Sequence, residues 1–359
     1  MARAPLTTRL PAPADERSAP ATPLAASPRH RTSTAAPAPH HTSDYRNISV
    51  LQIGRGAPYL GSVTTPVSDS PHPTRGSGLT AADVRIGYDG VPAVEGVDLA
   101  MRPGEVTALV GPNGSGKSTL LRALARLHPL TAGSVAFGDG TDLTDLPSRA
   151  LATRLTMLTQ MRPTPQGVRV RDAVALGRHP HRGRFRAGDP GGAEVIARAM
   201  RLTGVDAIAG AAVDELSGGQ LQRVWLASCL AQDTEVLLLD EPTNHLDMKY
   251  QVELLELLSA LAHDHGVCVG VVLHDLNHAA AIADRVALLS AGSIAAEGTA
   301  REVLRPDLLS QVYDIDVTTG YDEDHDLVIV RARPPRVRRP GAAAPEAPPG
   351  ERAPAEARP

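Results

Sequence analysis

A glycine-rich segment stands between an apolar run, residues 106–110, and a helix-like run that begins at Leu120. Its members, in order, are Gly111, Pro112, Asn113, Gly114, Ser115, Gly116, Lys117, Ser118 and Thr119. Glycines let successive backbone N–H groups turn toward one concave anion site at the start of a helix. Lys117 adds a positive charge for the outer phosphates of a nucleotide, and the Ser118 hydroxyl is suited to Mg²⁺. We therefore predict a strand, loop and helix that bind a nucleoside triphosphate.

A pair of acids follows a second apolar run, because Asp240 and Glu241 come directly after residues 237–239. An acid at the end of a buried strand beside a phosphate-binding loop can hold Mg²⁺ through its hydration shell, which is the role we expect for Asp240. Glu241 is expected to polarise the attacking water as a general base. A solvated turn is the alternative for paired acids, and the upstream glycine-rich loop disfavours it.

A serine and two glycines precede a further helix-like run, in the order Ser217, Gly218, Gly219 and Gln220. The serine hydroxyl and the unobstructed N–H groups of the glycines can meet an anion at the start of that helix. Taken alone, the same residues also fit an ordinary N-cap turn. The local sequence therefore leaves an anion site and a helix cap both open.

Strand-like and helix-like runs alternate around these motifs. Strands are expected at 84–88, 94–101, 134–137, 156–158, 236–239 and 267–273, and two more near 285–297. Helices are expected after Lys117, over 171–204 with breaks at 182–192, and at 247–263 and 276–283. The run 236–239 is wholly apolar, as is typical of a strand buried on both faces of a parallel sheet. The alternation predicts an α/β fold.

Composition narrows the function classes further. The formal net charge of −4 in 359 residues gives no electrostatic reason to expect a nucleic-acid partner. The two cysteines, Cys229 and Cys268, lie in apolar surroundings and are expected to be buried thiols. No apolar run approaches the ~20 residues that span a bilayer, and the first residues lack the apolar stretch of a signal peptide. The sequence therefore predicts a cytoplasmic protein whose membrane role comes from a partner.

Two segments lack any sustained hydrophobic period. Residues 1–78 are rich in Pro, Ala, Ser, Thr, Arg and His, and residues 334–359 have a similar composition. Such segments bury too little apolar surface to offset the entropy of ordering, so we expect both to be disordered. A start assigned upstream of the true one is an equally open explanation for residues 1–78.

Deleting residues 1–75 is expected to leave nucleoside triphosphate hydrolysis intact, because the segment holds no motif and no periodic apolar face. Steady-state hydrolysis by the truncated and full-length proteins checks this. A large loss of activity in the truncated protein would show that the segment is structural.

Taken together, the loop at 111–119, Ser217–Gln220 and the Asp240–Glu241 pair resemble the ATP-binding cassette (ABC) ATPases. The resemblance covers residues 79–318. It implies a P-loop NTPase fold with a RecA-like core, an antiparallel β subdomain and a helical subdomain at about 161–215, followed by an extension at 319–333. It also implies ATP and Mg²⁺ as cofactors, with Ser217–Gln220 binding nucleotide as the signature motif.

The resemblance also assigns roles to isolated residues. Tyr88 matches the aromatic that stacks on adenine, although a plain strand tyrosine remains the alternative. Gln160 matches a glutamine that senses Mg²⁺ and the γ-phosphate. The residues expected to hold Mg²⁺ are therefore Ser118, Gln160 and Asp240. His274 matches a switch histidine at the γ-phosphate, and Asp247 closes a loop that crosses a dimer interface. Thr159 departs from the proline that many relatives carry before this glutamine.

In this family two cassettes sandwich two ATP molecules, with Ser217–Gly219 of one copy facing Lys117 of the other. One P-loop and one signature per chain therefore imply a homodimer. Residues 170–181, with 244–247 and 274–280, resemble the ATPase subunits of ferric-siderophore importers, a lineage that includes haem and vitamin B12 importers. The implied partners are integral-membrane permease subunits and, indirectly, an extracytoplasmic solute-binding protein, which places the chain at the cytoplasmic face of the membrane. ATPases of other transporters remain the alternative.

Overall fold

The computed structural model describes residues 77–160, 164–182 and 188–333. Of the two segments expected to be disordered, only Ser77 and Gly78 fall inside these ranges. All described residues belong to one of the two compact units of the chain, residues 52–359.

A six-stranded sheet forms the centre of the described unit. Its strands, in spatial order, are β5 (Leu155–Leu158), β6 (Val236–Asp240), β7 (Cys268–Val272), β3 (Val106–Val110), β8 (Arg285–Ser290) and β9 (Ser293–Gly298). The first five run parallel, and β9 pairs antiparallel with β8. Every residue of β3, β5, β6 and β7 is buried, as expected for a parallel sheet covered on both faces.

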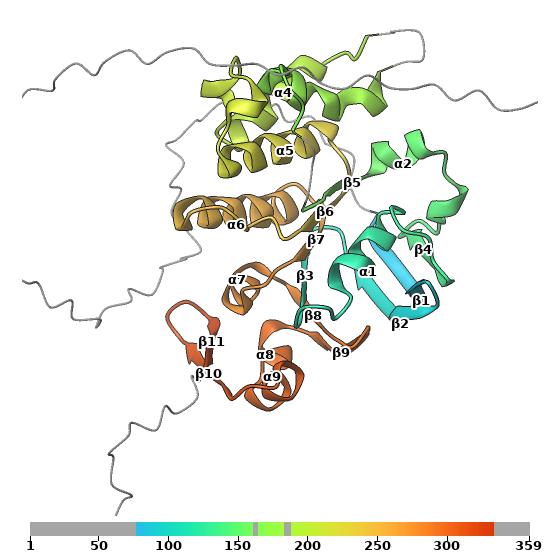
Figure 1. Cartoon of the computed structure of the whole chain (residues 1–359), viewed down its shortest axis with the longest axis vertical. Helices are drawn as coiled ribbons and strands as arrows, with labels where there is room; N and C mark the ends of the chain where they lie inside the picture. Colours follow the sequence, from blue (N-terminus) through green and yellow to red (C-terminus); the bar gives the residue numbers. More distant parts are fainter. Residues whose placement is uncertain (1–76, 161–163, 183–187, 334–359) are drawn as a thin grey trace, which may run out of the picture. The chain divides into compact units, whose positions relative to one another are not determined.

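Helices cover both faces of this sheet (Figure 1). Helix α1 (Lys117–Leu124), which follows the glycine-rich loop at 111–119 (the P-loop), packs on one face. Helices α6 (Met248–His263) and α7 (Leu276–Ile282) pack on the other. Along β3 the side chains alternate between the two cores, since Leu109 joins the α1 side and both Ala108 and Val110 join the opposite side. The alternation therefore holds the loop after β3 between two packed layers.

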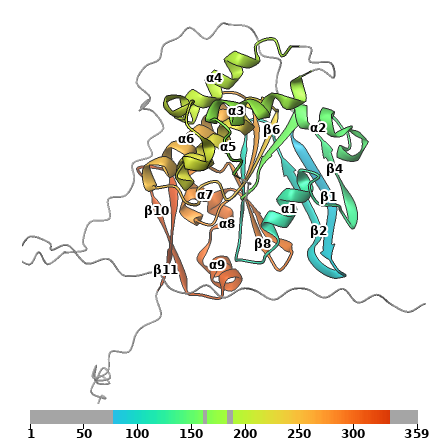
Figure 2. The same ribbon diagram turned by 45° about the horizontal axis from the view of Figure 1, so that its top comes forward.

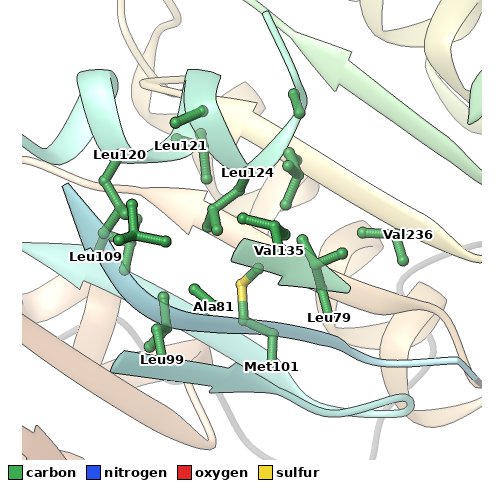
Figure 3. Packing of buried hydrophobic residues seen from close by; sticks show 14 of the residues in the cluster. Leu79, Ala81, Leu99, Met101, Leu109, Leu120, Leu121, Leu124, Val135 and Val236 are labelled. Carbon is green, nitrogen blue, oxygen red and sulfur yellow. The ribbon is translucent and has the colours of Figure 1, made fainter. Parts of the chain in front are cut away.

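A three-stranded antiparallel sheet lies on the far side of α1. Its order is β2 (Val91–Met101), β1 (Leu79–Tyr88) and β4 (Ala132–Phe137). Figure 3 shows leucines of α1 packing between this sheet and the central one, with Leu79, Met101 and Val135 below them. The apolar face of α1 is thereby buried on two sides, which fixes where its N-terminal loop lies.

Three helices form a separate cluster beyond β5. They are α3 (Val170–Ala175), α4 (Gly192–Leu202) and α5 (Gly218–Gln232), and short 3₁₀ segments lie between them at 176–181, 206–208 and 213–215. Arg178, buried in this cluster, donates to both oxygens of Asp189 at 2.7 and 2.8 Å. This ion pair lowers the pKa of Asp189, mainly through the guanidinium hydrogen bond.

The C-terminal part contains elements that sequence periodicity did not predict. They are α8 (Ala300–Val303), α9 (Pro306–Tyr313) and a hairpin of β10 (Val317–Asp322) and β11 (Leu327–Ala332). Figure 2 shows this hairpin beside α7. A short helix α2 (Ser148–Arg154) before β5 was also not predicted.

The predicted elements otherwise appear with small changes in their ends. The predicted helical region 171–204 is broken as expected, since α3 ends at Ala175 and α4 begins at Gly192. The first two strands are longer than predicted, because β1 begins at Leu79 and β2 at Val91. Both cysteines are buried, as the sequence predicts.

Candidate functional site

The glycine-rich loop joins the end of β3 to the start of α1, as its sequence predicts. Gly111, Gly114 and Gly116 adopt φ values of 143°, 79° and 98°, which disfavour any residue with a side chain. A Cβ atom at Gly111 would lie 2.2 Å from the Leu289 carbonyl oxygen, and one at Gly116 would lie 2.7 Å from the Ala93 carbonyl oxygen. The backbone of this loop is therefore pressed against its neighbours in a conformation that glycine alone tolerates.

Gly111→Ala is expected to lower nucleotide affinity by at least about tenfold, because the loop must move to relieve the clash with Leu289. Titration with a fluorescent ATP analogue measures the change. Gly140→Ala is a matched control: its φ of 83° imposes a similar backbone penalty, but no atom lies within 4 Å of the added Cβ. Equal affinity losses in the two variants would contradict the role given to the loop conformation.

Lys117 is buried, and its ammonium group donates to two carbonyl oxygens of the loop. The Nζ atom lies 2.8 Å from the Gly111 oxygen and 2.8 Å from the Pro112 oxygen. Burial lowers the pKa of Lys117, and the nearby carboxylates of Glu241 and Asp240 oppose that shift. The loop thus holds a cation directly beneath its concave side, close to two acids.

Asp240 lies at the end of β6, with its side chain fully buried. The Ser118 hydroxyl donates to its Oδ1 at 2.7 Å, and Arg122 Nη2 lies 3.2 Å from its Oδ2. A hydroxyl oxygen beside a carboxylate is a donor set that suits Mg²⁺, which is usually held by one or two protein oxygens together with substrate phosphates. The residues present therefore fit the expected cation.

Glu241 follows Asp240 with a φ of 54°, an unusual conformation for a residue with a side chain. Three donors surround its carboxylate. Gln160 Nε2 donates to Oε2 at 2.8 Å, Asn244 Nδ2 donates to the same oxygen at 2.6 Å, and His274 Nε2 lies 2.5 Å from Oε1. The carboxylate is thus held in one orientation by residues that are far apart in the sequence.

The positions of these residues follow from the order of the central sheet. Gln160 comes after β5, Glu241 after β6 and His274 after β7, and these three strands are neighbours. The carboxyl ends of parallel strands meet at one edge of a sheet, which is where ligands bind in open α/β folds. Since the glycine-rich loop follows the next strand, β3, four separate motifs converge at this edge.

Tyr88 ends β1 with 45% of its surface exposed. Its hydroxyl lies 3.4 Å from Thr119 Oγ1, and its ring meets His128 edge-on with centroids 4.6 Å apart. The tyrosine therefore lies partly exposed beside the C-terminal end of the glycine-rich loop. This position is compatible with a stacking role, and also with a plain structural one.

Ser217–Gln220 form a capping box at the start of α5. Gln220 N donates to Ser217 Oγ at 3.3 Å, and Ser217 N donates to Gln220 Oε1 at 3.0 Å. A Cβ on Gly219 would lie 3.4 Å from the His245 carbonyl oxygen, so this helix start borders the segment before α6. Asp247 caps α6 in turn, accepting from Tyr250 N at 3.0 Å. These hydrogen bonds of Ser217, Gln220 and Asp247 are thus local, unlike those that converge on Glu241.

Two contacts at the site were not foreseen from the sequence. Asn244 was expected only as a member of the segment 244–247, whereas its side-chain amide donates to the Glu241 carboxylate. No role was predicted for Arg122, which lies beside Asp240. The spacing of Asn244, three residues after Glu241, was the available signal for the first. Arg122, four residues after Ser118, shares a helix face with it, which was the available signal for the second.

His179 and His181, two residues apart in the sequence, have separate surroundings. His181 Nε2 lies 2.7 Å from the Gln232 carbonyl oxygen, while His179 is exposed. His181 thus ties residues 176–181 to the end of α5. Among the described ranges, no group of three or more His, Cys, Asp and Glu side chains is arranged to hold a metal ion.

Comparison with known proteins decides the family. The model of the ABC transporter family matches residues 94–244. The iron(3+)-hydroxamate import ATP-binding protein FhuC of Bacillus subtilis is 40% identical over 238 residues, covering 66% of this chain and 88% of the relative. The chain belongs to the ABC transporter ATP-binding family. It is an ABC ATPase.

Other relatives of this ABC ATPase carry related names. The ferric enterobactin transport ATP-binding protein FepC of Escherichia coli is 40% identical, covering 66% of this chain and 87% of the relative. The hemin import ATP-binding protein HmuV of Nocardia farcinica is 48% identical, over 60% of this chain and 74% of the relative. Identity is thus higher to the hemin relative, while the overlap is longer with the siderophore relatives.

Solved structures share the fold of the ABC ATPase. A dimeric bacterial ABC transporter cassette aligns with a TM-score of 0.56 and 28% identity, covering 62% of this chain and 99% of that one. A putative metal-chelate type ABC transporter in an inward-facing conformation aligns with a TM-score of 0.62 and 24% identity, covering 72% of this chain and 97% of that one. The P-loop NTPase fold with an antiparallel β sheet, predicted from the motifs, is therefore confirmed.

The described helices are also informative about the membrane. Within residues 77–160, 164–182 and 188–333, none of them combines the length and apolar character needed to cross a bilayer.

Proposed function

We propose that this ABC ATPase hydrolyses ATP to power the import of a ferric siderophore. The observation that carries the hydrolytic part is the Glu241 carboxylate, held by Gln160, Asn244 and His274 within the loop cluster that contains Lys117 and Asp240. A glutamate in that position is suited to accept a proton from an attacking water. The importer part rests on the relatives, since FhuC and FepC, each 40% identical over 66% of this chain, are named for iron(3+)-hydroxamate import and ferric enterobactin transport.

The nucleotide is bound by the P-loop in this proposal. Backbone N–H groups of residues 111–119 line the phosphates, Lys117 contributes the charge, and Tyr88 stacks on the adenine. Ser118, Gln160 and Asp240 hold Mg²⁺ together with the phosphates. When bound, that ion neutralises developing negative charge on the phosphate oxygens. The short contact of Ser118 with Asp240 supports the pairing of these two residues.

Glu241 acts as the general base. Its Oε2 atom accepts hydrogen bonds from Gln160 and Asn244, whereas Oε1 has one neighbour among the described residues, His274 Nε2 at 2.5 Å, so the second lone pair of Oε1 is the one that accepts from water. His274 lies beside Oε1 with 42% of its side chain exposed, so it can contact both the base and the γ-phosphate. We propose that His274 orients the base and that Gln160 senses the nucleotide from the other side.

The signature motif (Ser217–Gln220) and the loop that Asp247 closes act between two copies of the chain. Ser217, Gly218, Gly219 and Gln220 of one copy face the P-loop nucleotide of the other, and Asp247 lies at the same interface. The two motifs lie side by side within one copy, since a Cβ on Gly219 would lie 3.4 Å from the His245 carbonyl oxygen, and this supports a common interface for both. Isologous two-fold pairing suits a chain with one P-loop and one signature. Binding of ATP then favours the closed dimer, and hydrolysis favours the open one.

Permease subunits in the membrane transmit this cycle to the solute, and an extracytoplasmic solute-binding protein delivers that solute. We place the ATPase at the cytoplasmic face, held by the permease. Hemin import is the second candidate, favoured by the 46% and 48% identities to the hemin relatives of Streptomyces coelicolor and Nocardia farcinica. Cobalamin import is a weaker candidate, on 39% identity to a relative from Halobacterium salinarum.

Uptake of labelled ferric siderophores, hemin and cobalamin distinguishes these candidates. Cells that carry wild-type protein or Glu241→Gln are compared for each label, with matched protein levels. Selective loss of siderophore uptake in the variant is the expected result. Loss of hemin or cobalamin uptake instead would correct the solute. Unchanged uptake of all three labels in the variant, when purified wild-type protein hydrolyses ATP and the purified variant does not, would refute the proposed import.

A further inference from the structure

Helix α1 holds both oxygens of the Asp240 carboxylate. The Ser118 hydroxyl donates to Oδ1 at 2.7 Å, and Arg122 Nη2 donates to Oδ2 at 3.2 Å. Ser118 and Arg122 are four residues apart in α1, so their side chains leave the same face of the helix, which packs against β6. One helix therefore places a hydroxyl and a cation on the two oxygens of a single carboxylate.

The two donors differ in how easily each can leave Asp240. Ser118 lies in the first turn of α1, and its short side chain keeps the hydroxyl close to the helix backbone. Arg122 reaches Asp240 through a long side chain that is 41% exposed, whereas the side chain of Asp240 is fully buried. A long, partly exposed side chain can turn its charged end into water, but a buried carboxylate cannot follow it. Arg122 is thus the exchangeable partner of Asp240.

A second cation of the site is already engaged elsewhere. Lys117 Nζ donates to the Gly111 and Pro112 oxygens at 2.8 Å each. Among the described residues, Arg122 is the cation in ion-pair contact with Asp240. A buried carboxylate without a partner is costly, so this pair compensates the charge of Asp240. A divalent cation that uses Asp240 must therefore compete with a guanidinium.

We propose that Arg122 competes with the divalent cation for Asp240, so that the cation is held only together with the phosphates of a nucleotide. Arg122 is a positioning residue in this proposal, because it acts through Asp240. The inference rests on the proposed roles of Ser118 and Asp240 in holding Mg²⁺. Nucleotide phosphates add negative charge and further oxygen ligands, which offset the repulsion between the guanidinium and the cation. Without phosphates, a carboxylate shared with a guanidinium is a poor ligand for an ion that loses its water reluctantly.

The test is a titration of the full-length protein with Mn²⁺, which suits the same oxygen ligands as Mg²⁺. Unbound Mn²⁺ is measured by electron paramagnetic resonance, with and without a non-hydrolysable ATP analogue. Arg122→Gln and Arg122→Met both remove the positive charge, and methionine keeps a long apolar side chain on the helix. Each should tighten Mn²⁺ binding to the nucleotide-free protein by about 10-fold. With the analogue bound, the same changes should alter the affinity by a smaller factor, because the phosphates then supply the negative charge.

A gain of affinity separates this role from a structural one. Loss of folded protein lowers the number of Mn²⁺ ions bound per chain, but it does not tighten their binding. Arg122→Lys keeps the charge and should keep the wild-type affinity. Adding Asp240→Asn to Arg122→Gln should abolish the gain, which excludes Mn²⁺ that binds elsewhere on the chain.

Arg285→Gln is the matched control for the change in net charge. Arg285 begins β8, at the end of the strand opposite to the site, and pairs with Glu297 at 2.8 Å. This variant should bind Mn²⁺ with the wild-type affinity.

Unchanged Mn²⁺ affinity in both Arg122→Gln and Arg122→Met would overturn the inference, as would failure of both variants to fold. An equal gain in Arg285→Gln, or a gain of the same size with and without the ATP analogue, would also contradict it. Wild-type protein that binds no Mn²⁺ even with the analogue would instead refute the proposed roles of Ser118 and Asp240.

Discussion

Replacing Glu241 with glutamine is expected to lower the turnover number for ATP hydrolysis by at least about 100-fold, while ATP binding persists. Glutamine has the same shape, so its amide oxygen can still accept from Gln160 and Asn244, but it cannot accept a proton from water. The unreacted nucleotide then keeps two copies together. Steady-state hydrolysis, nucleotide titration and size-exclusion chromatography in ATP measure the three parts of this expectation.

Glu235→Gln is the matched control for this variant. Glu235 precedes the same strand, β6, at its opposite end, where its carboxylate pairs with Arg154. It receives the same chemical change outside the site, so turnover should stay near the wild-type value. Wild-type turnover in Glu241→Gln would remove Glu241 as the base, and similar losses in both variants would point to a general effect of the substitution.

The second large effect is expected for Lys117→Ala, which should weaken nucleotide binding by about 10- to 100-fold. The ammonium group is the one buried cation of the P-loop, and a charged hydrogen bond to phosphate contributes about 1.5–3 kcal/mol. Calorimetric titration with ATP measures the loss. In contrast to Glu241→Gln, this variant should not form a nucleotide-dependent dimer.

Folding stability separates loss of binding from loss of structure in Lys117→Ala. Burial lowers the pKa of Lys117 in the folded protein. The unfolded chain therefore binds the proton of the Lys117 ammonium group more tightly than the folded chain does. The charge thus opposes folding at neutral pH, while the hydrogen bonds of Lys117 to the Gly111 and Pro112 oxygens favour it, so a cooperative thermal transition of the variant without nucleotide is the measurement that shows it is folded. Arg102→Ala, at an exposed cation that pairs with Glu105 at 3.6 Å, is the control and should retain wild-type affinity. A Lys117→Ala protein with wild-type affinity would contradict the role of this residue.

The local parts of the fold were predictable from short stretches of sequence. The strand, loop and helix at 106–124 and the buried strand ending at Asp240 were expected from apolar runs and glycine spacing, and both are present. Prediction of the C-terminal hairpin failed because β10 carries no regular alternation of apolar residues. Helices as short as α8 and α2 likewise have too few residues for a helical period to appear.

The sequence by itself determined the phosphate-binding loop and the identity of the acids, because each motif lies within a few positions of the chain, and the family followed from the three motifs taken together. The tertiary structure decided which side chains meet. Gln160 and His274 reach Glu241 because β5, β6 and β7 are adjacent and parallel, so their carboxyl ends share one edge. The contacts of Arg122 with Asp240 and of Asn277 with Val330 depend likewise on how helices pack against strands. Strand order and packing are set by long-range burial, which a local pattern does not encode.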